Sequence, residues 1–297
     1  MSDPDTLPHI DLNTLRQYYA EELRAVANLQ SEALVRAFAK VPREHFLEPG
    51  PWQVLNPDFG GYWMTKDADP RRLYHNIIVA IDPSRHLNNG HPSFLAFLLD
   101  ELELQAGDRT VHVGCGTGYY TAVMAEIVGP EGHVTAIEVD HELAGRARGN
   151  LRYLPHVRVL EGNGSEIDPG PRDAILINAG ATHPQPIWVD SLDLDARLLL
   201  MLTVSDNESG HGFGGVLKVK RQDGGFAARF ISRVGVFPCI GARDLNLNER
   251  LKEVFKRGNR KSVQSLRRDS HNPSDTCWLH TDSFCLSALV VSSEVGN

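Results

Sequence analysis

The chain has 297 residues, of which 41% are hydrophobic and 23% are charged, a composition typical of a folded protein that excludes disordered and collagen-like chains. Thirty Lys and Arg against 38 Asp and Glu give a formal net charge of -8. This balance opposes a general attraction to nucleic acid or anionic membranes, so any site for a polyanion must be local.

Targeting and cysteine patterns point to the cell interior. Residues 1–13 contain no apolar stretch of the kind found in signal peptides, and no window approaches the ~20 apolar residues of a transmembrane helix. The four cysteines are dispersed and form neither a disulfide framework nor a C-x-x-C zinc motif. We expect a cytoplasmic protein without a membrane partner, and the sequence leaves a homo-oligomer open.

Apolar residues at helical spacing predict two helices between residues 12 and 41, where Pro42 interrupts the pattern. Residues 43–91 are rich in proline, glycine and asparagine and are expected to form an irregular lid over a site. From Pro92 onward, apolar strands with little alternation are separated by helical segments, which is typical of a parallel sheet buried on both faces. Two more strictly alternating segments, 216–221 and 226–237, predict an antiparallel hairpin that closes the sheet.

The predicted fold class is therefore α/β, with a Rossmann-like sheet, helices on both faces, an N-terminal helical and lid segment and an added C-terminal subdomain. The expected domains are residues 1–91 (N-terminal helices and lid), 92–240 (the cofactor-binding domain) and 241–297 (the C-terminal extension).

The strongest motif runs from Val111 to Tyr119, VHVGCGTGY, in which a predicted strand enters a glycine-rich turn that opens a helix. Glycines let the backbone turn sharply and approach a ligand closely, and the helix N-terminus presents free amides. The NAD fingerprint G-x-G-x-x-G would need glycine at Tyr119, or glycine or alanine at Thr121, so NAD is disfavoured. G-x-G-x-G is instead the pattern of methyltransferases that use S-adenosylmethionine (SAM).

Two features further along the chain support a nucleoside site. Glu138 ends the next predicted strand about twenty residues after the glycines, where a carboxylate can accept hydrogen bonds from both hydroxyls of a ribose. Gly162 and Asn163 follow the third strand, where a polar side chain can bond the adenine amino group.

Taken in order, several segments between about Arg36 and Ile240 resemble the protein-L-isoaspartate O-methyltransferase family. They are VPREHF at 41–46, the helix that opens at Pro92, GD at 107–108, the glycine loop, Glu138, EGNG at 161–164 and DAILINAGA at 173–181. The resemblance implies a Rossmann-like methyltransferase sheet, SAM as the donor and methyl esterification of a carboxylate of a protein or peptide. The predicted cofactor-binding residues are His112, Gly114, Cys115, Gly116, Thr117, Gly118, Tyr119, Glu138, Val139, Gly162, Asn163 and Asn178.

The chain departs from the family pattern at three positions. His112 stands where the family usually has an acidic residue, and Asn163 replaces the usual aspartate at the adenine. Gly90 replaces a serine whose hydroxyl the family associates with the substrate. Residues 48–94 also look like the relatives that accompany ATP-grasp peptide ligases and modify ribosomally made peptides, which leaves a divergent peptide-modifying enzyme open.

The acceptor pocket is expected near the end of the lid. Asn88, Asn89, His91 and Ser93 are predicted to line it, because amide and hydroxyl groups can orient a carboxylate without adding a competing charge. A carboxylate acceptor is already ionised at neutral pH and needs no general base. A hydroxyl or amine of a small molecule or peptide natural product would need one, and His91 or His183 would then be the candidates.

Two further patterns lie in the C-terminal extension. Between Arg250 and Arg268, eight Lys or Arg face one acidic residue, so nucleic-acid contact is an alternative, although a solvated helical face is the expected interpretation and nucleic acid is not an expected partner. Segments 277–280 and 284–286 are expected to be buried strands. Because two cysteines and one histidine there lack an evident fourth ligand, no metal site is predicted. A non-catalytic SAM-binding protein is the remaining alternative.

Overall fold

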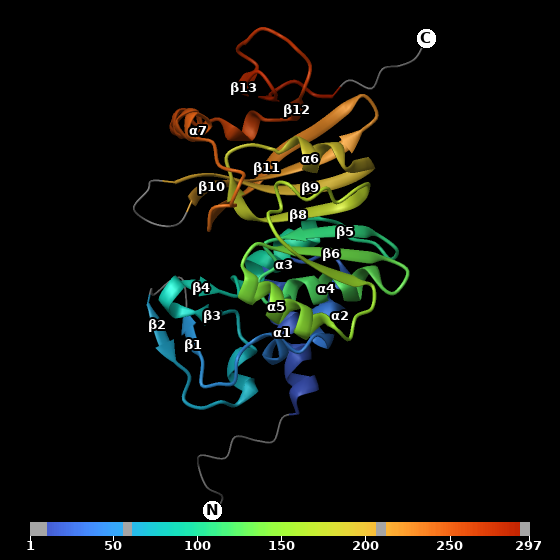
Figure 1. Ribbon diagram of the computed structural model, residues 1–297, viewed down its shortest axis with the longest axis vertical. Coiled ribbons are helices and arrows are strands. Elements are labelled where there is room, and N and C mark those ends of the chain that lie inside the picture. The colour runs from blue at the N-terminus through green and yellow to red at the C-terminus, as the bar shows by residue number, and fades with distance from the viewer. Residues whose placement is uncertain (1–10, 56–60, 206–211, 292–297) are drawn as a thin grey trace, which may run out of the picture.

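The computed structural model describes residues 11–55, 61–205 and 212–291 (Figure 1). The absence of a signal peptide was inferred from residues 1–13, most of which lie outside these ranges. The α-helices are α1 (Leu12–Ala27), α2 (Glu32–Lys40), α3 (Pro92–Glu101), α4 (Tyr119–Val128), α5 (His141–Leu151), α6 (Pro186–Asp190) and α7 (Leu245–Arg257). Short 3-10 helices span Arg43–Phe46, Pro70–Leu73, Pro83–Arg85 and Arg260–Ser262.

The strands form two sheets. The four short strands of the lid are β1 (Gln53–Leu55), β2 (Tyr62–Met64), β3 (Ile78–Asp82) and β4 (Leu87–Asn88). The others are β5 (Arg109–Val113), β6 (His133–Glu138), β7 (Val157–Glu161), β8 (Arg172–Ala181), β9 (Leu192–Val204), β10 (Gly212–Gln222), β11 (Gly225–Val236), β12 (Ser265–Arg267), β13 (Cys277–His280) and β14 (Cys285–Ser287).

The large sheet has ten strands in the order β13-β14-β12-β11-β10-β9-β8-β5-β6-β7. Strands β7, β6, β5, β8 and β9 pair in parallel, and β9, β10 and β11 pair antiparallel. This confirms the predicted parallel sheet and its closing hairpin. In Figure 1 the strands follow one another along the long axis of the molecule, and the N-terminal helices lie at the end opposite α7 and β13.

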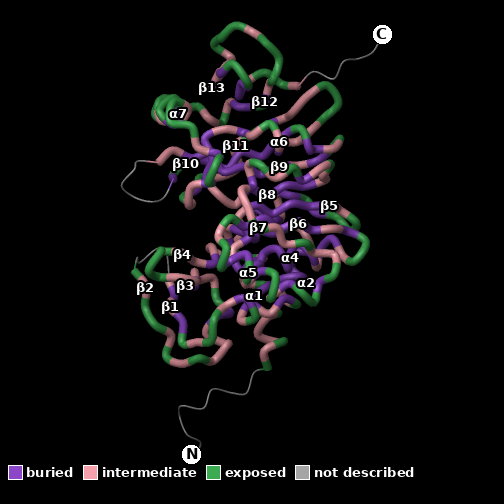
Figure 2. Tube along the Cα trace, viewed as in Figure 1, coloured by how far each residue is buried: buried purple, intermediate pink, exposed green. Residues whose placement is uncertain are grey.

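The parallel strands β5, β6, β8 and β9 are largely buried on both faces, as their apolar sequences predict, whereas β7 at the edge of the sheet is only partly buried (Figure 2). Helices α1 to α5 cover one face, and α6 and α7 cover the other. Alternate residues of β5 point to opposite sides, because the side chains of a strand have a period of two. Val111 and Val113 pack on the α6 and α7 side, whereas His112 faces α4. The fold is therefore the predicted α/β sheet with helices on both faces.

The lid forms a small antiparallel sheet in the order β2-β1-β3-β4, which projects beside α5 (Figure 1). Its base is held by Arg43, which is fully buried and donates hydrogen bonds to the carbonyls of Leu73, His75 and Ile77. These contacts join the two sides of the lid, so the segment is structured where the sequence predicted an irregular loop.

The C-terminal extension continues the large sheet. Strands β12, β14 and β13 add to β11 by antiparallel pairing, and α7 packs against β9 and β13. None of the helices in the described ranges is long and apolar enough to traverse a lipid bilayer. The domain boundaries predicted from the sequence stay a prediction.

Candidate active site

A cavity of about 470 Å³ lies where the parallel strands β5, β6 and β7 end. This is the edge at which open α/β sheets bind ligands. The lid closes one side of the cavity with residues 85–90, and residues 236–240, at and after the end of β11, close another. Its volume is within the range of small-molecule and cofactor sites.

The glycine loop forms the floor of the cavity between β5 and α4. Gly114, Gly116 and Gly118 have φ values of 75°, 57° and 96°, which side chains with a Cβ adopt only with strain. A Cβ at Gly114 would lie 3.0 Å from the Asn178 carbonyl oxygen, whereas at Gly116 it would meet open space. The Gly114 amide donates to the Ile137 carbonyl at 2.8 Å, which fixes the loop against β6.

Glu138 lies at the end of β6, is 7% exposed and borders the cavity. Its Oε2 accepts a hydrogen bond from the Gly116 amide at 2.8 Å, and its Oε1 accepts one from the Asp140 amide at 3.1 Å. Each carboxylate oxygen has two lone pairs, so both remain able to accept a bond from a ligand hydroxyl. This position and orientation match those expected for binding a ribose.

The residues present fit SAM. The open turn at Gly116 and the oriented carboxylate of Glu138 supply a close backbone approach and a partner for a sugar diol. Other predicted cofactor-binding residues also line this cavity: Cys115, Thr117, Tyr119, Val139, Gly162, Asn163 and Asn178. Their contact with the cofactor stays a prediction.

The amide of Asn163 is engaged within its own turn. Its Oδ1 accepts hydrogen bonds from the amide and hydroxyl of Ser165 at 3.0 and 2.8 Å, and its Nδ2 donates to Glu166 at 2.8 Å. A Cβ at Gly241 would come within 2.2 Å of Nδ2, so the segment after β11 packs directly on this side chain. Asn163 therefore shapes the wall of the cavity, and the adenine contact predicted for it stays a prediction.

On the lid side, Asn88 and Asn89 line the cavity, and their predicted contact with the acceptor stays a prediction. The Asn88 Oδ1 accepts a hydrogen bond from the Gly90 amide at 3.0 Å. The Asn89 Oδ1 accepts bonds from the Val79 amide at 3.0 Å and from Arg43 at 3.2 Å. Because both partners are donors, the orientation of the Asn89 amide is determined. Its Nδ2 is buried and has no hydrogen-bond partner among the described residues.

Five predicted site residues do not line the cavity. His112 lies on the face of β5 that packs on α4, where its Nδ1 lies 2.9 Å from the Thr121 hydroxyl, and burial lowers its pKa to about 4. This position does not support the predicted contact between His112 and the cofactor. The alternation of Val111, His112 and Val113 along the strand could have shown that the His112 side chain points away from the cavity. Gly118 caps α4 instead, with its amide bonded to the Cys115 carbonyl.

The three other residues were predicted near the acceptor. Ser93 is held by Asn76, whose Nδ2 donates to its hydroxyl at 3.0 Å. His91 precedes α3 and is absent from the lining of the cavity. His183 follows β8 and contacts Thr182, whose hydroxyl accepts from the Asp244 amide at the start of α7. Burial lowers the pKa of His183. Neither histidine is among the residues that line the cavity, and the base role predicted for them stays a prediction.

The sequence did not indicate two parts of the site. Arg85 forms an ion pair with Asp140, and both residues line the cavity, so this pair joins the lid to the loop after β6. The second is the wall from Val236 to Ile240. No local motif marks either part, because both depend on contacts between segments distant in the sequence.

The protein-L-isoaspartate(D-aspartate) O-methyltransferase family matches residues 65–227, more than half of the chain. The chain belongs to this family. It is accordingly a SAM-dependent carboxyl O-methyltransferase by family, which agrees with the fit of the cavity to SAM.

Individual proteins of the family show the same relationship. The protein-L-isoaspartate O-methyltransferase of Ignicoccus hospitalis is 35% identical over 153 residues, which cover 50% of this chain and 70% of that one. Protein-L-isoaspartate O-methyltransferase 2 of Archaeoglobus fulgidus is 32% identical over 219 residues, 68% of this chain and 88% of that one.

Solved structures show the fold. A protein-L-isoaspartate O-methyltransferase superposes with a TM-score of 0.61 at 23% identity, over 81% of this chain and 69% of that one. A Plasmodium falciparum structure of the same family, in complex with S-adenosyl-L-homocysteine, has a TM-score of 0.58 at 17% identity, over 75% of this chain and 97% of that one.

Proposed function

We propose that the protein methylates an aspartyl-derived carboxylate of a protein or peptide, and that Asn89 binds this carboxylate. The observation that carries the proposal is the buried Asn89 Nδ2, an unpaired donor on a residue that borders the same cavity as the glycine loop. Buried polar groups rarely lack partners, so an unpaired donor beside a cavity points to a ligand acceptor.

The charge behind Asn89 favours an anion. Arg43 is fully buried, and its guanidinium donates hydrogen bonds to three backbone carbonyls and to Asn89 Oδ1. In the described part of the chain no carboxylate forms an ion pair with it. Buried charges are normally paired, so a substrate carboxylate in the cavity would offset this positive charge through Asn89.

A carboxylate also suits the absence of a base. Among the described residues that line the cavity there is no histidine or lysine. Burial raises the pKa of the Cys239 thiol to about 11, so it stays protonated at neutral pH. Glu138 and Asp140 are held by backbone amides and Arg85. A carboxylate oxygen is already a nucleophile, whereas a hydroxyl or amine would first have to lose a proton.

When bound, SAM supplies an electrophilic methyl group on its sulfonium. The residues of the chain then act by position: the glycine loop and Glu138 hold the donor, while Asn89 holds the carboxylate in the same cavity. Such alignment of the reactants is the main source of rate enhancement that this site can provide.

The backbone conformation at Gly90 is unfavourable for the serine that the family usually has at this position. Its φ is 80°, and a Cβ there would lie 3.1 Å from Leu95 Cδ2. The backbone at this position therefore disfavours any side chain, and the acceptor must be bound by neighbouring groups such as the Asn89 amide.

Nucleic acid is not part of the proposal. Several cations of the basic run 250–268 are used within the extension: Arg250 and Arg257 bond the carbonyls of His280 and Trp278, and Arg268 pairs with Asp190. A cytoplasmic location and a homo-oligomer stay predictions.

The test uses SAM and two peptides that differ only in whether one residue is aspartyl or isoaspartyl. We expect at least one of the two peptides to gain one methyl group that is removed by mild base, as measured by mass spectrometry. If both peptides stay unmodified while SAM binds, or if the product resists mild base, the proposal is wrong.

The role of Asn89 is tested with Asn89→Asp, which keeps an oxygen for the contacts with Val79 and Arg43 but replaces the unpaired donor with an oxygen and adds a negative charge. We expect kcat/KM for the methylated peptide to fall at least roughly 10–100-fold, because a hydrogen bond to a charged group is lost and the new carboxylate repels the acceptor, with SAM affinity unchanged. Asn76→Asp is the matched control, since Asn76 lies in the lid but outside the cavity.

A further inference from the structure

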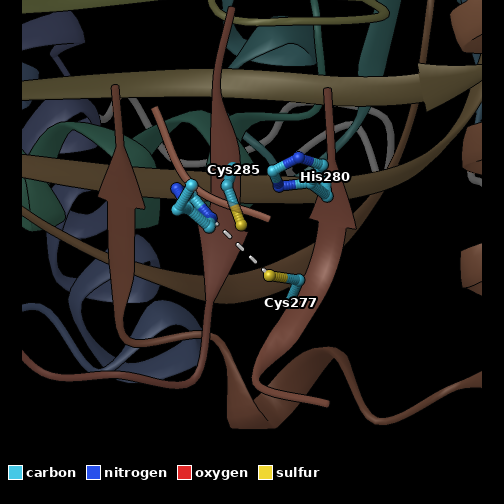
Figure 3. Close-up of side chains that lie close together, drawn as sticks. Cys277, His280 and Cys285 are labelled. Carbon is cyan, nitrogen blue, oxygen red and sulfur yellow. Dashed lines mark hydrogen bonds between the residues drawn. The ribbon is translucent and has the colours of Figure 1, made fainter. Parts of the chain in front are cut away.

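Four potential metal ligands meet in the C-terminal extension, far from the cavity along the sheet. They are His271, Cys277, His280 and Cys285, and their ligand atoms all lie within 4.8 Å of one another. Figure 3 shows the labelled Cys277 and His280 on one strand and Cys285 on its neighbour, with both sulfur atoms directed into the space between the strands. Sequence reasoning missed His271, which supplies the fourth ligand that the two strands lack.

The local fold explains why these side chains converge. Residues 277 and 280 are an odd number of positions apart, so in a regular strand they would point to opposite faces. The pairing of β13 with β14 is irregular between Cys277 and Leu279, a bulge that reverses the alternation. His280 pairs directly with Cys285 across the two strands. The bulge therefore brings both β13 ligands to the same side as Cys285.

The loop between β12 and β13 adds His271. Its Nδ1 lies 2.9 Å from the Asp269 carbonyl, a contact in which Nδ1 donates, so Nε2 carries the lone pair. That Nε2 lies 3.7 Å from the Cys277 sulfur. A hydrogen bond from the other ring nitrogen to a carbonyl is the usual way in which proteins orient a metal-binding histidine.

Two further observations support a metal ion at the centre of the cluster. His280 Nδ1 is buried and has no hydrogen-bond partner among the described residues. The Cys277 sulfur accepts a hydrogen bond from the Ser274 amide at 3.4 Å, as a thiolate would. In a tetrahedral zinc site the ligand atoms lie about 3.3–3.8 Å apart, so the separations in the cluster need to contract by at most about 1.5 Å to bind the ion.

We propose that His271, Cys277, His280 and Cys285 bind one structural zinc ion. Two thiolates and two neutral imidazoles balance the two positive charges of zinc, and tetrahedral sulfur and nitrogen ligands favour zinc over magnesium or calcium. The two thiols release their protons to solvent when the ion binds. All four positions are ligands, so no position is open to substrate and the site is structural.

The position of the site explains what it stabilises. Strands β12, β13 and β14 span three or four residues each at the edge of the large sheet. Strands this short hold few ladder hydrogen bonds, and a metal ion that joins both strands to the loop before them would fix their register. Arg250 and Arg257 of α7 bond carbonyls of β13, so the zinc ion would also anchor that helix.

The test begins with the metal content of the full-length protein, purified under reducing conditions without a metal-affinity tag. We expect one zinc ion per chain, measured by elemental mass spectrometry. The double variant Cys277→Ser, Cys285→Ser should contain no zinc. Cys239→Ser is the matched control and should retain zinc, because this cysteine lies outside the cluster.

A second measurement avoids variants that fail to fold. Wild-type protein is stripped with a chelator and titrated with cobalt(II), for which we expect one equivalent with the visible spectrum of a tetrahedral, thiolate-bound ion. Amide exchange in β13 and β14 should be about tenfold or more faster in the stripped protein and should recover with zinc. A disulfide between Cys277 and Cys285 in the reduced preparation, or saturating zinc without binding or protection, would overturn the proposal.

Discussion

The Glu138 carboxylate accepts a hydrogen bond from the Gly116 amide at 2.8 Å, so the acid that ends β6 and the turn that follows β5 hold each other in place. This contact orients the carboxylate before any ligand arrives. Binding energy is then not spent on ordering the side chain.

Glu138→Gln should weaken SAM binding roughly 10–100-fold, because one charged acceptor of the ribose hydroxyls is lost. Calorimetry with SAM measures the change. Glu161→Gln is the matched control, since Glu161 is the register partner of Glu138 on β7, pairs with His141 and Arg148 and does not line the cavity. Equal affinity of both variants would contradict the assignment of the ribose site.

Gly90→Ser should not raise activity toward isoaspartyl peptides and should lower the free energy of unfolding by ~1–2 kcal/mol, because a side chain is strained at a φ of 80°. Urea denaturation measures the cost. Gly145→Ala provides a control of opposite sign: Gly145 lies within α5 with nothing within 4 Å of its Cβ position, so alanine should stabilise by ~0.5–1 kcal/mol. A fully stable, more active Gly90→Ser protein would refute this account of the position.

Arg85→Gln should raise the KM for SAM roughly two- to fivefold at low ionic strength, because it breaks the ion pair that joins the lid to Asp140. The difference should fade at high salt, where exposed charges are screened. Arg71→Gln tests whether any lid ion pair has this effect, since Arg71 pairs with Asp69 away from the cavity. A salt-independent change would show that the ion pair is not the cause.

His112 should make the protein sensitive to mild acid. Its folded-state pKa of about 4 lies below the ordinary 6.5, so the unfolded chain binds the proton first as pH falls. The stabilisation is complete above pH 6.5 and is lost as pH falls toward 4, by on the order of 2 kcal/mol between pH 6.5 and 5. The His112→Gln variant should lose less stability than the wild type between pH 6.5 and 5. Urea denaturation at the two pH values measures the free energy of unfolding of both proteins.

His141→Gln supplies the opposite sign for the same experiment. The hydrogen bond and charge of Glu161 raise the pKa of His141, so its contribution is present at low pH and is lost as pH rises. The His141→Gln substitution should therefore lower the free energy of unfolding slightly more at pH 5 than at pH 8. Identical pH profiles for wild type and His112→Gln would rule out the titration of His112 as a cause.

The sequence was most informative where function depends on neighbouring residues. The glycine loop and Glu138 lie at the ends of adjacent parallel strands, so the strand pattern alone predicted that they would meet. His112 shows the limit of a motif, because its place in the loop suggested a ligand while the period of the strand turns it toward α4.

Local sequence patterns could not predict contacts between segments that are distant in the sequence. Asn89 was predicted as one polar lid residue among several, and only the fold shows that Arg43, 46 positions earlier, uses its oxygen and leaves its nitrogen unpaired. His271 lies in a loop that carries no motif. The bulge in β13, which places Cys277 and His280 on the same side of the sheet, has no sequence signature either.

The wall from Val236 to Ile240 begins nine positions beyond residue 227, where the family match stops. A protein shortened to residues 65–227 would therefore not be a minimal enzyme. Its donor crevice would be open along one flank, and solvent would reach the bound nucleoside. The complete crevice therefore needs residues beyond the segment that the family model matches.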